Sequence, residues 1–67
     1  MINPLTGMPM LASAEKYVED LQVERIRLAR TVKRSGSPTK RLEAAQRIVE
    51  IDTWIEQAYI GEYNQRL

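Results

Sequence analysis

Apolar and polar positions alternate regularly along most of this chain. Between residues 14 and 34, apolar side chains recur at steps of three and four, at Ala14, Tyr17, Val18, Leu21, Leu28, Ala29 and Val32. This spacing is typical of an amphipathic helix with one side turned toward a core. Ser13 is a suitable N-cap, and Lys33 and Arg34 complement the dipole at the other end. We predict a first helix over residues 14–34.

A second helix is predicted over residues 38–61, with Gly61 at its end, or alternatively with a continuation through Gly61 to Tyr63. Ser37 followed by Pro38 is a specific helix start, because serine caps free N–H groups and proline suits the first helical position. The next apolar positions have the 4-3 spacing of a coiled-coil seam, at Ala44, Ile48, Ile51, Ile55 and Ala58. Residues 35–37 leave room only for a short turn, so the helices must pack antiparallel. The sequence therefore predicts an all-α fold, an antiparallel two-helix hairpin over residues 13–67.

Residues 1–12 are predicted to form an extended apolar arm. Pro4, Gly7 and Pro9 prevent a regular helix in this segment. The arm is nevertheless rich in apolar side chains, namely Ile2, Leu5, Met8, Met10 and Leu11. Two interpretations remain open, a frayed terminus or an arm that lies in a groove of its own dimer or of a partner.

Several apolar side chains lie away from the predicted seam between the helices. Their presence on both helices favours an intermolecular surface. The predicted dimer or partner interface comprises Val23, Ile26, Leu42, Val49, Trp54, Tyr59 and Ile60. A chain of 67 residues without cysteine has a small core and no disulfide to stabilise it. We therefore expect a homodimer, in which two hairpins form a four-helix bundle with two-fold symmetry.

Charge is distributed unevenly along the chain. Residues 25–47 contain eight basic side chains and one acid, Glu43, whereas the rest holds eight acids against Lys16 and Arg66. The bases around the predicted turn form a basic tip, at Arg30, Lys33, Arg34, Lys40 and Arg41. In the second helix the bases precede the acids, which opposes the helix dipole. An antiparallel dimer would explain this order, because it places the basic tip of one hairpin beside the acidic open end of the other.

Arg25 interrupts the apolar stripe of the first helix, between Leu21 and Leu28. An arginine in a core is costly unless it is paired. Asp52 flanks the facing seam at a matching height, so we predict an Arg25–Asp52 pair that fixes the register of the helices. The alternative is that Arg25 anchors a ligand or a partner.

No catalytic or cofactor-binding constellation can be assembled from these residues. Histidine and cysteine are absent, so the common metal ligands and nucleophile–base pairs are missing. The serines are better used in caps and turns, and the glycines lack P-loop spacing. We expect no enzyme activity, no metal and no cofactor. The sequence also shows no signal-peptide pattern and no apolar run of membrane-spanning length, so we expect a cytoplasmic protein without a membrane partner.

Nucleic acid is the main alternative to a protein partner. Lysines and arginines around a turn can contact phosphates, and nearby hydroxyl groups can add hydrogen bonds. However, the net charge is only +1, and the aromatic side chains that would stack on bases lie outside the basic segment, at Tyr17, Trp54, Tyr59 and Tyr63. Aromatic residues and arginines dominate the energetics of protein interfaces, so a larger protein partner is favoured.

Two resemblances bear on the origin of the chain. The short two-helix plan resembles the Rop-type plasmid proteins, which are antiparallel hairpin dimers. Residues 37–54, from Ser-Pro-Thr-Lys to Ile-Asp-Thr-Trp, are similar to the second helix of small phage head-completion proteins of the lambda W type. That family has a β-hairpin between its helices, where this chain has only Ser-Gly-Ser-Pro.

These resemblances imply a phage or plasmid origin. Small proteins of that origin often bind host regulators, so the leading hypothesis is a non-enzymatic inhibitor or anti-activator of a host regulatory protein, for example a transcription factor. Two alternatives remain, a nucleic-acid-binding helical dimer that uses the basic tip, and a small phage structural protein of the head-completion kind.

Overall fold

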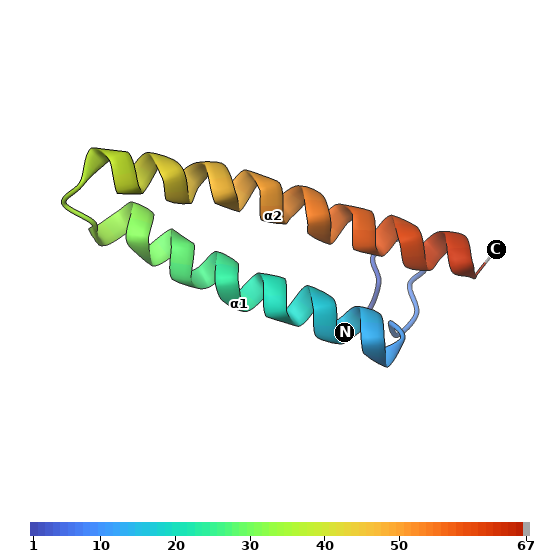
Figure 1. The fold of residues 1–67 in the computed structure, drawn as a ribbon. Helices are drawn as coiled ribbons and strands as arrows, with labels where there is room; N and C mark the ends of the chain where they lie inside the picture. The colour runs from blue at the N-terminus through green and yellow to red at the C-terminus, as the bar shows by residue number, and fades with distance from the viewer. Residues whose placement is uncertain (67) are drawn as a thin grey trace.

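The computed structural model describes residues 1–66 and contains two helices, α1 (Ala12–Arg34) and α2 (Pro38–Gln65), which run side by side in opposite directions (Figure 1). The molecule is a rod of 46 × 16 × 15 Å. Within the described residues there is no strand, only an isolated antiparallel bridge between Ile2 and Pro9. The predicted all-α, antiparallel two-helix hairpin is confirmed. Leu67, the last residue of the predicted hairpin segment, lies outside the described residues.

The turn between the helices is built as the sequence predicts. The Ser37 hydroxyl accepts a hydrogen bond from the Lys40 N–H at 3.3 Å, and Pro38 occupies the first turn of α2. Ser35 ends α1 in an extended conformation, and its hydroxyl accepts a hydrogen bond from the Ser37 N–H at 3.1 Å. The two serines therefore satisfy backbone donors that would otherwise be free at the helix ends.

Both helices extend beyond their predicted limits at the end of the rod opposite the turn, which we call the open end. α1 begins at Ala12, with Leu11 rather than Ser13 at the N-cap position. α2 continues through Gly61 to Gln65. Both differences arise where the N-terminal arm contacts the helices, because the Leu11 N–H is held by the side chain of Glu62 at 2.7 Å.

The core is narrow, because two helices can cover only one side of each other. Its buried apolar side chains come from α1 (Val18 and Leu21), α2 (Ala44 and Ile51) and the arm (Met10). The remaining predicted seam residues are only half-buried, except Tyr17 and Ala29, which are exposed. Charged residues are interspersed with the apolar ones, and no helix of the described chain has an apolar stretch that could cross a membrane.

Candidate protein interface

Two ion-pair clusters distinguish the two broad faces of the rod. Arg25 pairs with Asp52 on one face, and Arg47 pairs with Glu24 on the other. Asp52 and Arg47 lie about 140° apart around α2, on either side of the buried Ile51, at about 100° per residue. We call the first the Arg25–Asp52 face and the second the Trp54 face, because Arg47 covers the Trp54 ring.

The Arg25–Asp52 pair is bidentate and partly exposed. Arg25 Nε donates to Asp52 Oδ1 at 2.7 Å, and Nη2 donates to Oδ2 at 3.4 Å. The Asp52 carboxylate raises the pKa of the Arg25 guanidinium above its usual value. The side chains are 44% and 52% exposed, so Arg25 lies at the edge of the core rather than within it. The two predicted partners thus meet, and the role of the pair in setting register stays a prediction.

On the Trp54 face, Arg47 shields the indole ring. Its guanidinium carbon lies 4.5 Å from the ring centroid, a cation–π distance. The same guanidinium donates to Glu50 at 3.0 Å and to Glu24 at 3.2 Å, and these carboxylates raise its pKa above its usual value. Trp54 is therefore half-buried under an ion-paired arginine and does not stand free as an anchor for a partner.

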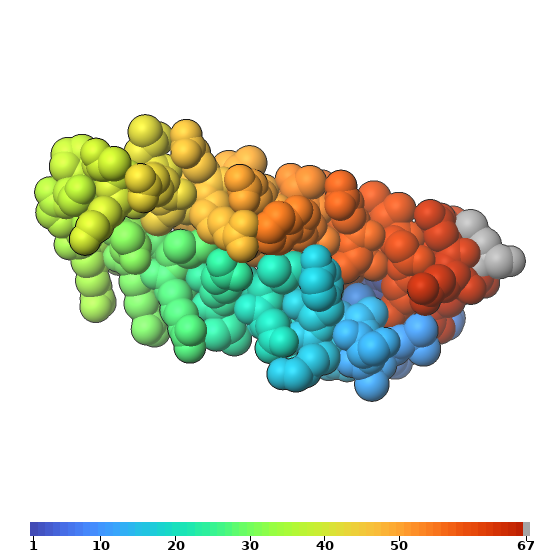
Figure 2. Space-filling model, in the orientation of Figure 1, coloured from blue at the N-terminus to red at the C-terminus, as the bar shows by residue number. Residues whose placement is uncertain are grey.

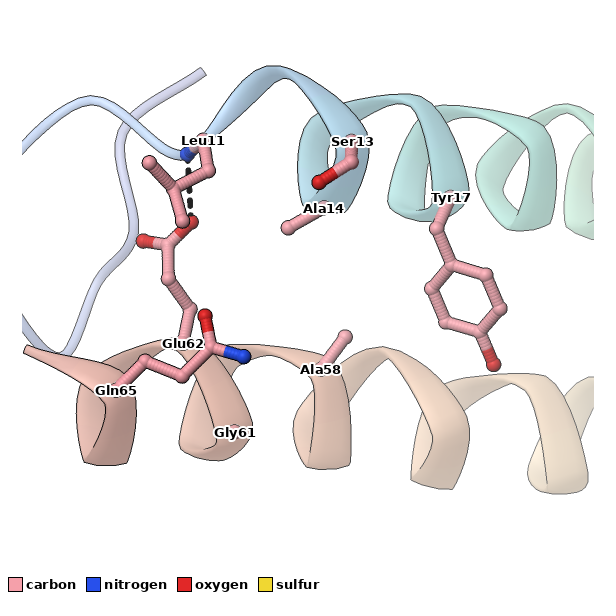
Figure 3. Close-up of a pocket in the computed structure, with 8 residues that line it drawn as sticks. All are labelled: Leu11, Ser13, Ala14, Tyr17, Ala58, Gly61, Glu62 and Gln65. Carbon is pink, nitrogen blue, oxygen red and sulfur yellow. Dashed lines mark hydrogen bonds between the residues drawn. The ribbon is translucent and has the colours of Figure 1, made fainter.

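Two shallow grooves run between the helices on the Trp54 face. Figure 3 shows the groove at the open end, where Ala14 and Ala58 face each other across a space of about 300 Å³. The lining residues of this groove are Leu11, Ser13, Ala14, Tyr17, Ala58, Gly61, Glu62 and Gln65. A second groove of about 340 Å³ lies nearer the turn, lined by Leu28, Thr31, Lys40, Glu43, Ala44 and Arg47. Both are open to solvent, and the described residues hold no acidic cluster suited to a metal ion.

A buried carboxylate joins the arm to α2. Glu62 is only 3% exposed, and its Oε2 accepts a hydrogen bond from the Leu11 N–H at 2.7 Å. Its Oε1 accepts from Asn3 Nδ2 at 3.2 Å and lies 3.5 Å from Arg66 Nε. We call Asn3, Leu11, Glu62 and Arg66 the latch. A buried charge is costly unless it is paired and hydrogen-bonded, and the latch supplies both kinds of partner.

The arm itself is a compact turn held by its own backbone. The backbone of Asn3 makes two hydrogen bonds across this turn: its N–H donates to the Met8 carbonyl at 2.9 Å, and its carbonyl accepts from the Gly7 N–H at 2.8 Å. Gly7 has a φ of 67°, which suits glycine and strains other residues. Arg66 Nη2 also donates to the Pro9 carbonyl at 2.7 Å, so the turn is fixed to α2 at a second point.

The arm covers the open end of the Arg25–Asp52 face. Asn3 Nδ2 donates to the Tyr59 carbonyl at 3.0 Å, and Tyr59 follows Asp52 at heptad spacing. The Met1 ammonium pairs with Glu15 at 3.0 Å and holds the pKa of that carboxyl below its usual range. In Figure 1 the arm crosses between α2 and α1 near the ends of the helices and leaves the rest of the hairpin uncovered.

The uncovered part of the Arg25–Asp52 face carries an apolar strip. Ile26 of α1 and Val49 of α2 are 55% and 66% exposed. Ala29 follows Ile26 by three residues on α1. On α2, Ala45 precedes Val49 by four residues and Ile48 by three, so it links these two residues along the same side. We call these five residues the apolar strip. Exposed apolar residues gathered in one place are typical of an interaction surface.

Most acids of the described chain are used in internal ion pairs, whereas most bases around the turn are not. Within residues 1–66, six cations have no ion-pair partner: Arg27, Arg30, Lys33, Arg34, Lys40 and Arg41. Only Glu19, Glu43 and Glu56 are free among the acids in the same range. Figure 2 shows long side chains that project from the green part of α1, away from α2.

The residues of the predicted interface do not all share one surface. Ile26 belongs to the apolar strip. Leu42 and Ile60 lie on the outer side of α2, away from Ile51, and Val49, at heptad spacing from Leu42, lies where this outer side meets the strip. Val23 points outward from α1 and Trp54 lies on the opposite face, while the Tyr59 carbonyl contacts the arm.

Sequence reasoning missed Asn3, Met10 and Glu62. The arm is apolar and the end of α2 is rich in acids, and no repeating sequence pattern indicates that these two segments contact each other. Comparisons with protein-family models, curated proteins and solved structures found no match for this chain.

Proposed function

We propose that this chain is a non-enzymatic protein-binding module that works as a homodimer, in which two hairpins form a four-helix bundle. The observation that carries the proposal is the exposed apolar strip beside a narrow core. The side chains of Ile26 and Val49 are apolar, yet more than half of each is exposed to solvent. Fully burying one such side chain contributes about 1.5–3 kcal/mol. A second copy that covers the strip would therefore add substantially to a core that has few buried apolar side chains.

The larger protein that the dimer would bind is proposed to be a cytoplasmic host regulator, which the module inhibits. Two features support a protein with an acidic surface as this partner. The six cations around the turn have no carboxylate partner within the described residues. The groove that contains Lys40 and Arg47 opens beside them on the Trp54 face, away from the apolar strip. A partner could thus use Arg30, Arg34 and Lys40 at the tip, together with the groove, while the strip holds the dimer together.

Sedimentation equilibrium at micromolar concentration tests the homodimer, and the expected mass is twice the 7.7 kDa of one chain. Ile26→Asp should abolish the dimer, because it would bury a charge at the centre of the strip. Leu42→Asp is the matched control, because Leu42 is also exposed and lies on the outer side of α2. A wild-type monomer at all concentrations would refute the proposal. Affinity capture from the native host with wild type and I26D then asks whether the larger partner requires the dimer.

Nucleic-acid binding is the second candidate, and the six unpaired cations favour it. Titration of duplex DNA and RNA at several salt concentrations is the test, because each phosphate contact steepens the dependence of log K on log salt by about 0.9 for B-DNA. If this candidate holds, Arg30→Ala with Arg34→Ala should weaken binding and flatten that dependence. Lys16→Ala is the control, since Lys16 is a base already paired with Asp20. Binding without a salt dependence would exclude a phosphate-contacting tip.

A further inference from the structure

Free charges flank the apolar strip symmetrically along α1. Glu19, Ile26 and Lys33 follow one another at heptad spacing, so they share one side of the helix. All three are exposed, and neither charge has an ion-pair partner within residues 1–66. An acid and a base thus lie at equal distances on either side of Ile26, each about 10 Å away at 1.5 Å per residue.

The same arrangement recurs on α2. Arg41 and Glu56 lie at equal sequence distances from the Ile48–Val49 peptide bond, and both are exposed and free of ion pairs in the described chain. Ala45 lies between Arg41 and this midpoint. On this helix the base comes first, which is the reverse of the order on α1. Because the helices are antiparallel, both bases lie toward the turn and both acids toward the open end.

The two midpoints lie at the same level of the rod. Glu24 contacts Arg47 and Arg25 contacts Asp52, so the segment around Ile26 is level with the segment around Ile48. A single axis that lies in the plane of the Arg25–Asp52 face, perpendicular to the helices, therefore passes both midpoints. A rotation of 180° about this axis exchanges the position of each base with that of an acid.

We propose that a second copy of this chain binds the Arg25–Asp52 face about this axis, with α1 against α1 and α2 against α2, antiparallel. This register rests on the homodimer proposed above. Lys33 of each copy then faces Glu19 of the other, and Arg41 faces Glu56 of the other. Ile26 meets Ile26 at the axis, and the two apolar strips cover each other. The arms flank the overlap, because each covers its own open end of the same face.

The charges also exclude the opposite orientation. If the second copy were parallel, with α1 against α2 and both turns at one end, Lys33 would face Arg41 and Glu19 would face Glu56. Exposed ion pairs contribute little to affinity, but like charges placed opposite each other select against the wrong register. The apolar strip therefore holds the copies together, and the four charges on each copy fix their direction.

Paired charge reversals test this register. We expect Lys33→Glu with Arg41→Glu to weaken self-association about tenfold or more, because four acids would then line the face. Glu19→Lys with Glu56→Lys should do the same with four bases. Mixed in equal amounts, the two variants should form a heterodimer of near wild-type affinity, and the variant with all four reversals should form homodimers again. Arg27→Glu with Arg34→Glu is the control of equal charge change, at positions on the outer side of α1.

The outcomes separate the register from the homodimer itself. If the wild type is monomeric, the proposed function fails. If the wild type is dimeric but K33E/R41E still self-associates as well as the R27E/R34E control, this register is wrong while the homodimer stands. Failure of the two complementary variants to pair would also overturn the register. Circular dichroism of each variant monitors its helices, and a variant that unfolds alone must regain helix in the mixture if the register is right.

Discussion

The side-chain amide of Asn3 donates a hydrogen bond to the buried carboxylate of Glu62 at 3.2 Å, which joins the start of the arm to the last turns of α2. Asn3 is fully buried, and the same nitrogen also donates to the Tyr59 carbonyl at 3.0 Å. One amide thus satisfies two acceptors from α2. The open end of the hairpin is therefore held together by hydrogen bonds between the arm and α2.

Asn3→Ala should destabilise the protein by about 2 kcal/mol, because it leaves the Tyr59 carbonyl and one Glu62 oxygen without this donor in a buried place. Urea unfolding monitored by circular dichroism measures the change, at one fixed protein concentration so that any association contributes equally. Asn64→Ala is the control, since Asn64 is an exposed residue of the same end of α2. Equal stability of N3A and wild type would show that the latch contributes nothing.

Asn3→Asp should make stability depend on pH in a way that the wild type does not. Two carboxylates in one buried site raise the pKa of at least one of them above its unfolded value. The folded state then binds a proton more tightly than the unfolded state, so the penalty is largest at neutral pH and shrinks as the pH falls through the raised pKa. Unfolding curves of N3D and wild type at neutral and acid pH should therefore converge on acidification, and a pH-independent gap between them would contradict this.

Replacing each of two glycines by alanine should change the stability of the protein in opposite directions. Gly7 has a φ of 67°, so Gly7→Ala should cost about 1 kcal/mol or more through backbone strain. Gly61 lies inside α2, and a Cβ built there meets no atom within 4 Å. Gly61→Ala should therefore stabilise the protein by up to about 1 kcal/mol through helix propensity. Thermal unfolding of the two variants should show melting temperatures on opposite sides of the wild-type value.

Arg25→Met should leave the free energy of unfolding nearly unchanged, because the Arg25–Asp52 pair is exposed to solvent and screened. If the pair sets register, the variant should still fold, while crosslinks between cysteines placed at levels one turn apart on α1 and α2 should become less selective. If stability and selectivity both hold and only partner binding is lost, Arg25 is an anchor for a partner rather than a register device.

The hairpin could be predicted because its determinants are local. Ser37 and Pro38 mark a helix start within two residues, and the spacing of Ala44, Ile48 and Ile51 repeats within a few turns. The Arg25–Asp52 contact followed from the antiparallel geometry, since each helix fixes the height of its residues. None of these features depends on how the arm folds.

The latch could not be predicted in the same way. Glu62 has the appearance of an ordinary surface acid, and Asn3 precedes a proline in a segment without periodicity. Their partnership depends on how the arm folds back, which no repeating pattern encodes. The start of α1 at Ala12 and the end of α2 at Gln65 lie outside the predicted limits for the same reason, because both ends lie beside the arm.

The latch also has a kinetic consequence. The two helices can form and pair outward from the Ser37 turn through contacts of increasing sequence separation, and the contact between Asn3 and Glu62 closes nearly the whole chain into a loop. Before the helices have paired, closing a loop of that length carries a larger entropic cost than closing the turn. We expect the latch to form last in folding and to open first under native conditions. Backbone amides near Leu11 would then exchange with solvent sooner than those around Val18 and Ile51, and an early opening event would expose Met10 before the hairpin itself separates.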